Sequence, residues 1–337
     1  MSTTRAGTTE RDRRIVFPGA DRIELEAFDV GDPAPDEVVV RVALSLMSTG
    51  TEGIVLSGQH ESGSNWARYA RFPFHPGYAS IGIVETIGRA VTDLAPGSSV
   101  AVRRPHASRV RLPATDVIRI PHGVDPLDAT WFAAGAITFR AMQAARAHIG
   151  EPVLIVGAGP IGQLCARWAY AAGLTPIIVV DPFPERLELA ARGGATATLA
   201  APIAEAVAGA RDANDGTVPG VIIEATGNSS VFADVLHAAP DFGRIVLIGD
   251  PAFPSDQHLT SDLLVRGLTV VGAHDSQIRE GWTGQRAARL FFSMLEAGRL
   301  RVDGLVTHTF AAEEAAAAYR LAQTDRRLTM GIVFDWR

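Results

Sequence analysis

The chain has 337 residues, of which 47% are hydrophobic and 20% are charged, and this length and composition predict a globular protein with two domains. A net charge of −6 without a basic stripe argues against nucleic acid as a partner, and no apolar stretch is long enough to span a membrane. All 31 basic residues are arginine, which excludes a Schiff-base lysine. The single Cys165 and a polar start without a signal-peptide core favour a cytoplasmic protein, with residues 1–13 as a flexible tail.

The segment after this tail reads as short strands separated by turn residues, which is typical of a β-rich, barrel-like module. The expected strands cover residues 37–46, 79–87, 99–102, 110–112 and 117–120. From Pro126 the pattern becomes helical, and Asp128 is the candidate N-cap of that helix.

Between residues 152 and 274 strands and helices alternate, and this alternation predicts a doubly wound parallel sheet. Its expected strands cover residues 152–156, 176–180, 220–224, 244–248 and 268–272. The rest of the chain is expected to be helical over residues 282–325, with a strand near residues 304–310 and a last strand at 330–334. The predicted fold class is therefore α/β, with a β-rich module followed by a parallel sheet.

The turn after the first strand of this sheet carries the clearest chemical signal in the chain. The strand runs into G-A-G-P-I-G, and a helix from Pro160 to about Ala172 follows. Gly157 permits the tight turn, Gly159 lets a pyrophosphate approach the backbone, and Gly162 lets the helix pack closely against the strand. The helix N-terminus offers N–H groups and a positive dipole end to phosphates. The sequence therefore predicts a dinucleotide site.

Asp181 ends the second strand of the same unit, where an acidic residue can accept hydrogen bonds from both ribose hydroxyls. A carboxylate at this place would repel a 2′-phosphate. We therefore predict that NAD(H) is the cofactor, in preference to NADP(H).

Several motifs occur together along the chain: PDEVVVRV, PGYASIGIVETIG, LAPGSSVAV, VLIVGAGPIGQL, EATGN, GRIVLIG, LTVVGAH and LVTHTFAAEEAAAAY. In this combination the chain resembles the medium-chain dehydrogenase/reductase superfamily, the zinc-type alcohol dehydrogenase-like proteins, over nearly all of residues 14–337. The resemblance implies a GroES-like catalytic domain made of residues 14–137 and 275–337. It also implies a Rossmann NAD-binding domain of residues 138–274, with the active site in the cleft between the two domains.

The zinc ligands of that superfamily are missing at each position that the resemblance identifies. Thr49 stands where the first ligand cysteine would be, Tyr78 and Ala79 replace the histidine and the glutamate, and the third site falls near Ala134. The four-cysteine structural lobe is absent, because Arg103–Ser108 joins its flanking strands directly. Catalytic zinc needs three protein ligands, so we predict no zinc at either site. The pattern is locally similar to the zinc-free bacteriochlorophyllide dehydrogenase group.

Four residues near the missing metal are the catalytic candidates. By resemblance, Thr51 matches the hydroxyl that relays the alcohol proton in zinc members, while Thr49 and Tyr78 occupy former ligand positions. Tyr78 is expected to donate a hydrogen bond to a carbonyl or to act as a general acid, and the alternative is an aromatic side chain that fills the vacated metal site. Glu52 matches an acid behind the ligands and either orients the loop or takes a proton.

The resemblance also implies residues that hold the cofactor. Thr138 would touch the nicotinamide from the junction helix, and Ile161 would pack against the nicotinamide ring. The strand ends that line the adenosine and the carboxamide would be formed by Thr226, Gly227 and Gly249, and His274 would lie near the nicotinamide and the dimer edge. Arg186 would cover the adenine or ribose, or else lie solvated on its helix. His75 is expected in a turn or in the cleft, and the remaining histidines are expected in loops or at the surface: His60, His106, His122, His148, His237, His258 and His308.

The leading functional prediction is a zinc-independent, NAD-dependent oxidoreductase that interconverts a secondary alcohol and a ketone on a sugar, cyclitol or specialised metabolite. Two alternatives remain, an enone or quinone reductase of the same superfamily and a non-catalytic NAD-binding protein. The aromatic stretch between Glu52 and Gly77 indicates a lid over the substrate or an ordinary loop with a small core of its own. The apolar residues 268–272 are expected to pair with a second copy in a homodimer.

Overall fold

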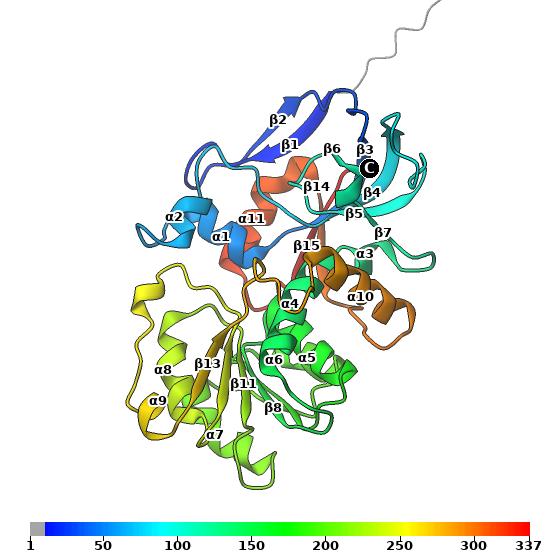
Figure 1. The fold of residues 1–337 in the computed structure, drawn as a ribbon. Helices are drawn as coiled ribbons and strands as arrows, with labels where there is room; N and C mark the ends of the chain where they lie inside the picture. Colours follow the sequence, from blue (N-terminus) through cyan, green and yellow to red (C-terminus); the bar gives the residue numbers. More distant parts are fainter. Residues whose placement is uncertain (1–10) are drawn as a thin grey trace, which may run out of the picture.

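The computed structural model describes residues 11–337, which form two regions, each built on its own main β-sheet (Figure 1). The strands are β1 (Asp12–Val16), β2 (Glu24–Phe28), β3 (Glu37–Leu46), β4 (Ser80–Ile87), β5 (Ser99–Val102), β6 (Arg109–Pro113), β7 (Ile118–Arg119), β8 (Val153–Val156), β9 (Ile177–Val180), β10 (Ala197–Leu199), β11 (Val221–Glu224), β12 (Arg244–Leu247), β13 (Thr269–Gly272), β14 (Val306–Ala311) and β15 (Gly331–Asp335). The α-helices are α1 (Thr49–Ser57), α2 (Asn65–Tyr69), α3 (Pro126–Ala129), α4 (Phe132–Ala145), α5 (Pro160–Ala171), α6 (Pro184–Arg192), α7 (Ile203–Asp212), α8 (Ser229–Ala238), α9 (Asp262–Val265), α10 (Gly284–Glu296) and α11 (Ala315–Thr324). Short 3₁₀ turns cover η1 (Ala114–Asp116), η2 (Pro254–Asp256) and η3 (Ala312–Glu314).

The predicted doubly wound sheet is present, and the α/β fold class is confirmed. Its six strands follow the order β10-β9-β8-β11-β12-β13, and every neighbouring pair is parallel. Strands β8 and β9 are wholly buried because helices cover both faces, with α5 packed on one side and α7 and α8 on the other. The strand order reverses between β8 and β11, and ligands bind at the carboxyl ends of strands at such a reversal.

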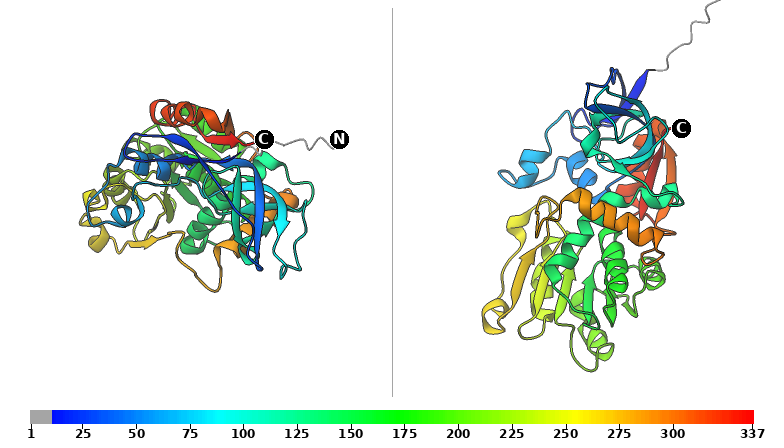
Figure 2. Two further views of the ribbon diagram at one scale, coloured as in Figure 1. Left: turned by 90° about the horizontal axis from the view of Figure 1, so that it is seen from above. Right: turned by 45° about the vertical axis from the view of Figure 1, so that its right-hand side comes forward.

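The other region contains the sheet β14-β15-β3-β4-β5-β7, to which β6 is added through β3, and a separate hairpin of β1 and β2. The C-terminal strand β15 pairs antiparallel with β3, so that Val333 lies opposite Leu46. The end of the chain therefore completes a sheet that its beginning starts. Figure 2 shows this return, with the red C-terminal segments beside the blue and cyan strands.

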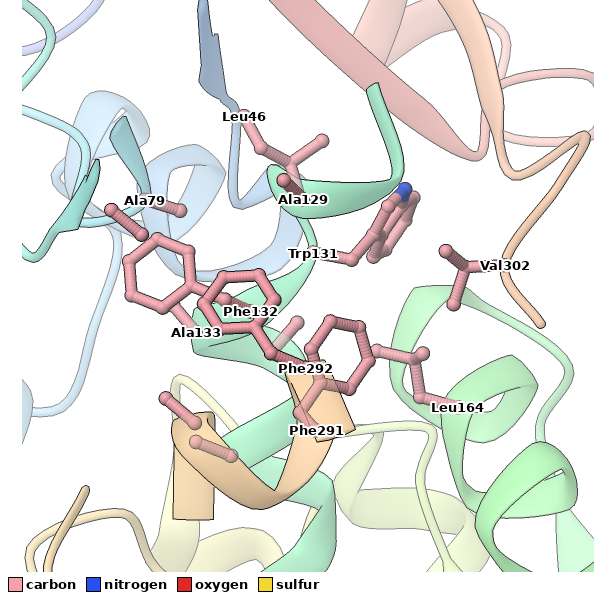
Figure 3. Close-up of a cluster of buried hydrophobic side chains, with 14 of the residues drawn as sticks. Leu46, Ala79, Ala129, Trp131, Phe132, Ala133, Leu164, Phe291, Phe292 and Val302 are labelled. Carbon is pink, nitrogen blue, oxygen red and sulfur yellow. The ribbon is translucent and has the colours of Figure 1, made fainter. Parts of the chain in front are cut away.

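The two regions share one hydrophobic core where α4, α5 and α10 meet. Rings of Phe132, Phe291 and Phe292 gather there with Trp131, and Leu164 reaches the cluster from α5 (Figure 3). A Cβ at Gly135 would lie 2.3 Å from the Phe291 ring, so glycine allows α4 and α10 to pack this closely. This core stabilises one side of the interface between the two regions.

A second contact between the two regions lies at the aromatic segment before β4. The Trp66 indole N–H donates to the Pro251 carbonyl at 3.0 Å, and the Glu61 N–H donates to the Ala252 carbonyl at 2.9 Å. Ser64 caps the short helix α2 by accepting a hydrogen bond from the Ala67 N–H. Trp66 is 6% exposed and packs in a small core under α1, so the segment bridges both regions rather than projecting into solvent.

Two local expectations from the sequence are corrected. Strand β1 begins at Asp12 and pairs with β2, so Asp12 and Arg13 do not belong to a flexible tail, while residues 1–10 of that predicted tail lie outside the described residues. The cap of α3 is Asp125 and not Asp128, because the Asp125 carboxylate accepts the N–H groups of Leu127 and Asp128.

The expected domain boundary at residues 137 and 138 falls inside α4, which runs without a break from one region to the other. Among residues 11–337, no helix combines the length and the apolar character that crossing a membrane requires.

Candidate active site

The glycine turn between β8 and α5 is partly exposed to solvent, although the stretch around it is buried. Residues 153–169 are buried except for Gly159, Pro160 and Ile161, which are partly exposed. The first backbone hydrogen bond of α5 runs from the Gln163 N–H to the Gly159 carbonyl. The N–H groups of Ile161 and Gly162 therefore point out of the helix N-terminus, which is a favourable place for a phosphate.

The three glycines of this turn differ in what they do. Gly157 has φ of +97°, and a Cβ at Gly162 would lie 1.8 Å from the Gly157 carbonyl oxygen, so both are required by the backbone itself. A Cβ at Gly159 would meet no atom within 4 Å, and its φ is −70°. The protein leaves open space at Gly159 that its own packing does not use, which fits a dinucleotide pyrophosphate.

Asp181 lies at the end of β9 and is 4% exposed. Its carboxylate accepts the Ala158 N–H at 2.8 Å and the Phe183 N–H at 2.9 Å. The Arg186 Nη1 atom lies 3.6 Å from the same carboxylate, with the guanidinium 5.1 Å from the Phe183 ring centroid. Burial lowers the pKa of Arg186, although the charge of Asp181 opposes that shift. Arg186 thus lies over Asp181 and partly neutralises the carboxylate. Its predicted contact with the adenine or ribose stays a prediction.

A cavity of about 340 Å³ opens between α1, the loop after β12 and α11. Thr49 and Gly53 line it from α1, Phe253 from the loop, and Gln323 and Arg326 from the end of α11. The Arg326 carbonyl accepts a hydrogen bond from the Arg186 guanidinium, so the cavity adjoins the Asp181 end of the cofactor cleft. Thr49 therefore lines the cleft between the two regions.

Tyr78 lies on the substrate side of α1, and two hydroxyls surround its phenol. The Tyr78 O–H donates to Ser48 Oγ at 2.6 Å, and the Thr51 hydroxyl also hydrogen-bonds with it. Burial raises the pKa of Tyr78, so the phenol keeps its proton at neutral pH. Ser48 occupies the N-cap of α1, but its hydroxyl makes no capping hydrogen bond to the helix. It accepts the hydrogen bond from the Tyr78 O–H instead.

Glu52 lies behind this pair at the centre of a buried network. Its carboxylate accepts the Ser48 N–H at 2.8 Å, the Tyr319 hydroxyl at 2.5 Å and a bond from His106 Nε2 at 3.2 Å. The other nitrogen of His106 is 2.8 Å from Ser45 Oγ. His106 lies in the loop between β5 and β6, as one of its two expected places, but it is 0% exposed and is not at the surface. Glu52 orients the start of α1 and joins it to α11 and to the loop after β5.

The strand ends across the cleft hold the other expected cofactor residues. Thr226 donates its hydroxyl to Glu224, and a Cβ at Gly249 would lie 2.2 Å from the Gly227 nitrogen, so close backbone packing accounts for that glycine. Burial raises the pKa of Glu224, whose second oxygen is buried without a partner. His274 is exposed, with Nδ1 2.8 Å from Ser276 Oγ.

Thr138 is the expected cofactor residue that the structure does not bring to the cleft. It is 0% exposed, and its hydroxyl donates to the Ala134 and Gly135 carbonyls of its own helix. The helical pattern of the sequence could not show that the Thr138 side chain would be buried and bonded to its own helix.

The residues at the former metal position do not fit zinc. Thr49 and Tyr78 offer neutral hydroxyls, the Tyr78 hydroxyl is bonded to Ser48, and Ala134 offers no donor atom. Across residues 11–337, no group of three or more His, Cys, Asp or Glu side chains is arranged to hold a metal. Glu52 and His106 are adjacent but are engaged with Tyr319 and Ser45.

The sequence alone did not identify three polar residues near Tyr78. Ser48 carried a signal, since a serine before a helix is a typical cap. The other two are Arg103, whose guanidinium lies 5.3 Å from the Tyr78 ring centroid, and Asp275, which is 2.7 Å from Arg103. They follow strands of different sheets, and no local pattern links them.

A parallel sheet with a glycine-rich phosphate turn, joined through a cleft to a β-rich region with buried hydroxyls, is the arrangement expected of a two-domain, dinucleotide-binding enzyme. Residues 160–286 match the family model of zinc-binding dehydrogenases. The chain is 26% identical to L-threonine 3-dehydrogenase of Bacillus licheniformis over 64% of its own length and 60% of that relative. It is 27% identical to L-threonine 3-dehydrogenase of Anaeromyxobacter sp. (strain K) over 81% of its own length and 86% of that relative.

Two solved structures share the fold over nearly the whole chain. A zinc-binding dehydrogenase from Sinorhizobium meliloti 1021 bound to NADP has a TM-score of 0.80 at 23% identity, covering 97% of this chain and 100% of that one. An alcohol dehydrogenase from Escherichia coli CFT073 complexed with NADH has a TM-score of 0.79 at 19% identity, covering 97% and 100%. These comparisons show that the chain is similar to zinc-type dehydrogenases, and the expectation of an enzyme of this dehydrogenase class is confirmed.

Proposed function

We propose that this protein is a zinc-independent, NAD(H)-dependent dehydrogenase that interconverts a secondary alcohol and a ketone, in a zinc-free branch of its superfamily. The observation that carries the proposal is the pairing of Tyr78 with Ser48 and Thr51 at the place where zinc members hold their metal. This site presents a protonated phenol and no metal ligands. Sugars, cyclitols or other hydroxylated metabolites are the substrate class that such a polar pocket favours.

Tyr78 would hydrogen-bond to the substrate oxygen and move the proton. Bound NADH supplies the hydride to the carbonyl carbon in the direction of reduction. The Tyr78 phenol would donate its proton to the oxygen as the alkoxide forms, and Ser48 or Thr51 would return a proton to the phenolate from solvent. In oxidation the same protons move in reverse. Since burial raises the pKa of Tyr78, oxidation should accelerate toward alkaline pH.

The preference for NAD(H) rests on Asp181, whose two oxygens are fixed by backbone N–H groups beside the phosphate turn. A 2′-phosphate would approach this fixed negative charge. Arg186 weakens the repulsion, so we expect a preference of about tenfold in kcat/KM and not an absolute exclusion of NADP(H).

The reaction class is tested by comparing NADH and NADPH oxidation with a panel of ketones and a panel of enones, in the wild type and in Tyr78→Phe. We expect ketone reduction with NADH, and a loss of about 10²-fold or more in kcat for Tyr78→Phe. Rapid enone reduction with NADPH that survives Tyr78→Phe would instead support an enone reductase. Turnover that is unchanged in Tyr78→Phe and Thr51→Ala would remove both residues from the mechanism.

Zinc independence has a separate test. The purified enzyme should contain far less than one zinc per chain by elemental analysis and keep its activity after dialysis against a chelator. One zinc per chain, with activity lost on chelation and restored by zinc, would overturn this part of the proposal.

The assembly that we propose is a homodimer formed through β13. This strand lies at the free edge of the six-stranded sheet, and its unpaired backbone groups need a partner. Large apolar side chains are exposed on the preceding segments, namely Phe242, Leu264 and Val265. Light scattering at micromolar concentration should give twice the mass of the chain, and a monomer would contradict the pairing.

A further inference from the structure

An ion pair joins the two regions beside the proposed reaction centre. Arg103 follows β5 in the catalytic sheet, and Asp275 follows β13 in the parallel sheet. Arg103 Nη2 lies 2.7 Å from Asp275 Oδ2, and the two side chains are 32% and 27% exposed. In Figure 1 the segment after β13 crosses between the two regions. The pair thus links the two regions directly.

The surroundings of this pair are polar and partly closed to solvent. The Arg103 guanidinium lies 5.3 Å from the Tyr78 ring centroid, which places the pair next to the proposed proton donor. The Tyr69 phenol lies within the electrostatic field of Tyr78, Arg103 and Asp275. Partial burial, together with the charges of Tyr78, Glu52 and Asp275, raises the pKa of Tyr69 to about 12, so Tyr69 is a neutral phenol at working pH.

One atom of the pair has no partner. Asp275 Oδ2 is bonded to Arg103, but Asp275 Oδ1 is buried and accepts no hydrogen bond. A buried charged acceptor without a donor costs free energy, so a donor from outside the chain is expected there. Arg140 also acts on Asp275 through its charge, but its guanidinium donates to the Trp282 carbonyl.

We propose that Asp275 Oδ1 accepts a hydrogen bond from a second hydroxyl of the substrate, and that Arg103 holds the carboxylate in place for it. The enzyme would therefore act on a neutral diol, polyol or sugar, and would discriminate against alcohols with one hydroxyl. Because Asp275 carries a negative charge, a substrate with a carboxylate or phosphate at this position would be repelled. This inference rests on the proposed dehydrogenase activity and names its substrate class.

The experiment measures kcat/KM with NAD for matched pairs of alcohols, 2,3-butanediol against 2-butanol and 1,2-propanediol against 2-propanol, with sorbitol and myo-inositol added. We expect the wild type to prefer each diol by about 100-fold or more, because a site built to bind a hydroxyl discriminates strongly against its absence. Asp275→Ala should reduce that preference by at least about 30-fold, and Arg103→Met should reduce it less. Asp212→Asn, an exposed aspartate on α7, is the matched control.

Each outcome decides the inference. A wild type that oxidises diols and monoalcohols equally well, or an Asp275→Ala variant with an unchanged ratio, would overturn it while leaving the proposed dehydrogenase activity intact. A raised KM for NAD with an unchanged ratio would show that Oδ1 serves the cofactor and not the substrate.

If no alcohol is oxidised, calorimetric titration of the NADH complex with sorbitol and myo-inositol replaces turnover. Binding that is weakened in Asp275→Ala supports the inference, and absence of binding contradicts it. Thermal melts of each variant identify any change that comes from misfolding, since the pair bridges two regions.

Discussion

The two ends of the cleft are built in different ways. The cofactor end is a short unit, in which β8, the glycine turn, α5 and Asp181 come from one continuous stretch of 29 residues, 153 to 181. The substrate end gathers Ser48, Tyr69, Tyr78, Arg103 and Asp275 from separate strands and loops of both regions. Local backbone geometry therefore specifies the first end, and the packing of two sheets against each other specifies the second. Substitutions at the two ends should therefore differ in their effects on stability and on binding.

The largest effect on stability and cofactor binding is expected at the glycine turn. Substitution of Gly162 disturbs the packing of the protein, whereas substitution of Gly159 fills only the space for a ligand. In Gly162→Ala the added Cβ would lie 1.8 Å from the Gly157 carbonyl oxygen, so α5 must shift. We expect a loss of about 3 kcal/mol in the free energy of unfolding, together with a loss of cofactor binding. Urea unfolding and fluorescence titration with NADH measure the two quantities.

Gly159→Ala is the matched variant, because its Cβ meets no protein atom within 4 Å. Its free energy of unfolding should change by less than about 0.5 kcal/mol, while the affinity for NADH falls at least about tenfold. Unchanged NADH affinity in Gly159→Ala would mean that the pyrophosphate does not bind next to Gly159.

The next effect concerns the buried carboxylate at the substrate end. Glu52→Gln places an amide NH₂ among donors from Ser48, Tyr319 and His106. We expect a loss of about 3 kcal/mol in the free energy of unfolding, since a buried hydrogen-bonded charge is removed while its partners stay. Urea unfolding measures the loss, and Glu188→Gln, at an exposed position on α6, is the control. A loss equal to that of the control would show that the network contributes nothing to stability.

A smaller effect is expected at Arg186, and it appears in selectivity more than in stability. Arg186→Ala removes the positive charge 3.6 Å from Asp181 and leaves the carboxylate unneutralised. The ratio of kcat/KM for NADH to that for NADPH should rise by about five- to tenfold. Steady-state kinetics with both cofactors measure it, and a fall in the ratio would mean that Arg186 instead supports NADH binding.

The smallest effect is expected at Asp128, which lies outside both ends of the cleft. Partial burial beside Asp125 and Asp303 raises the pKa of Asp128 to about 6. A raised pKa means that the folded protein binds the proton more tightly, so this group stabilises the fold below about pH 4 and loses that contribution as pH rises toward 6.

Asp128→Asn should therefore stabilise the protein at pH 7 by about 1 kcal/mol or less, because solvent screens a half-buried group. The gain should vanish at pH 4. Thermal melts from pH 4 to pH 7, with Asp212→Asn as the control, measure it. A gain that is equal at both pH values would show that the charge of Asp128 is not its cause.

By itself the sequence determined the elements whose pattern is local. Five of the six parallel strands, the glycine turn and Asp181 were identified, because strand periodicity, backbone φ and helix termini depend on neighbouring residues. The short strand β10 (Ala197–Leu199) was not predicted. It also predicted, through a resemblance, that Thr49 and Tyr78 stand at positions of metal ligands, and this stays a prediction.

Only the tertiary structure decided which side chains meet. His106 is buried against Glu52 because the loop after β5 packs on α1, Thr138 is buried and hydrogen-bonded within its own helix, and Arg103 reaches Asp275 from a different sheet. These contacts join residues that are far apart in the chain, and their formation depends on how the two regions pack around the shared core of α4, α5 and α10.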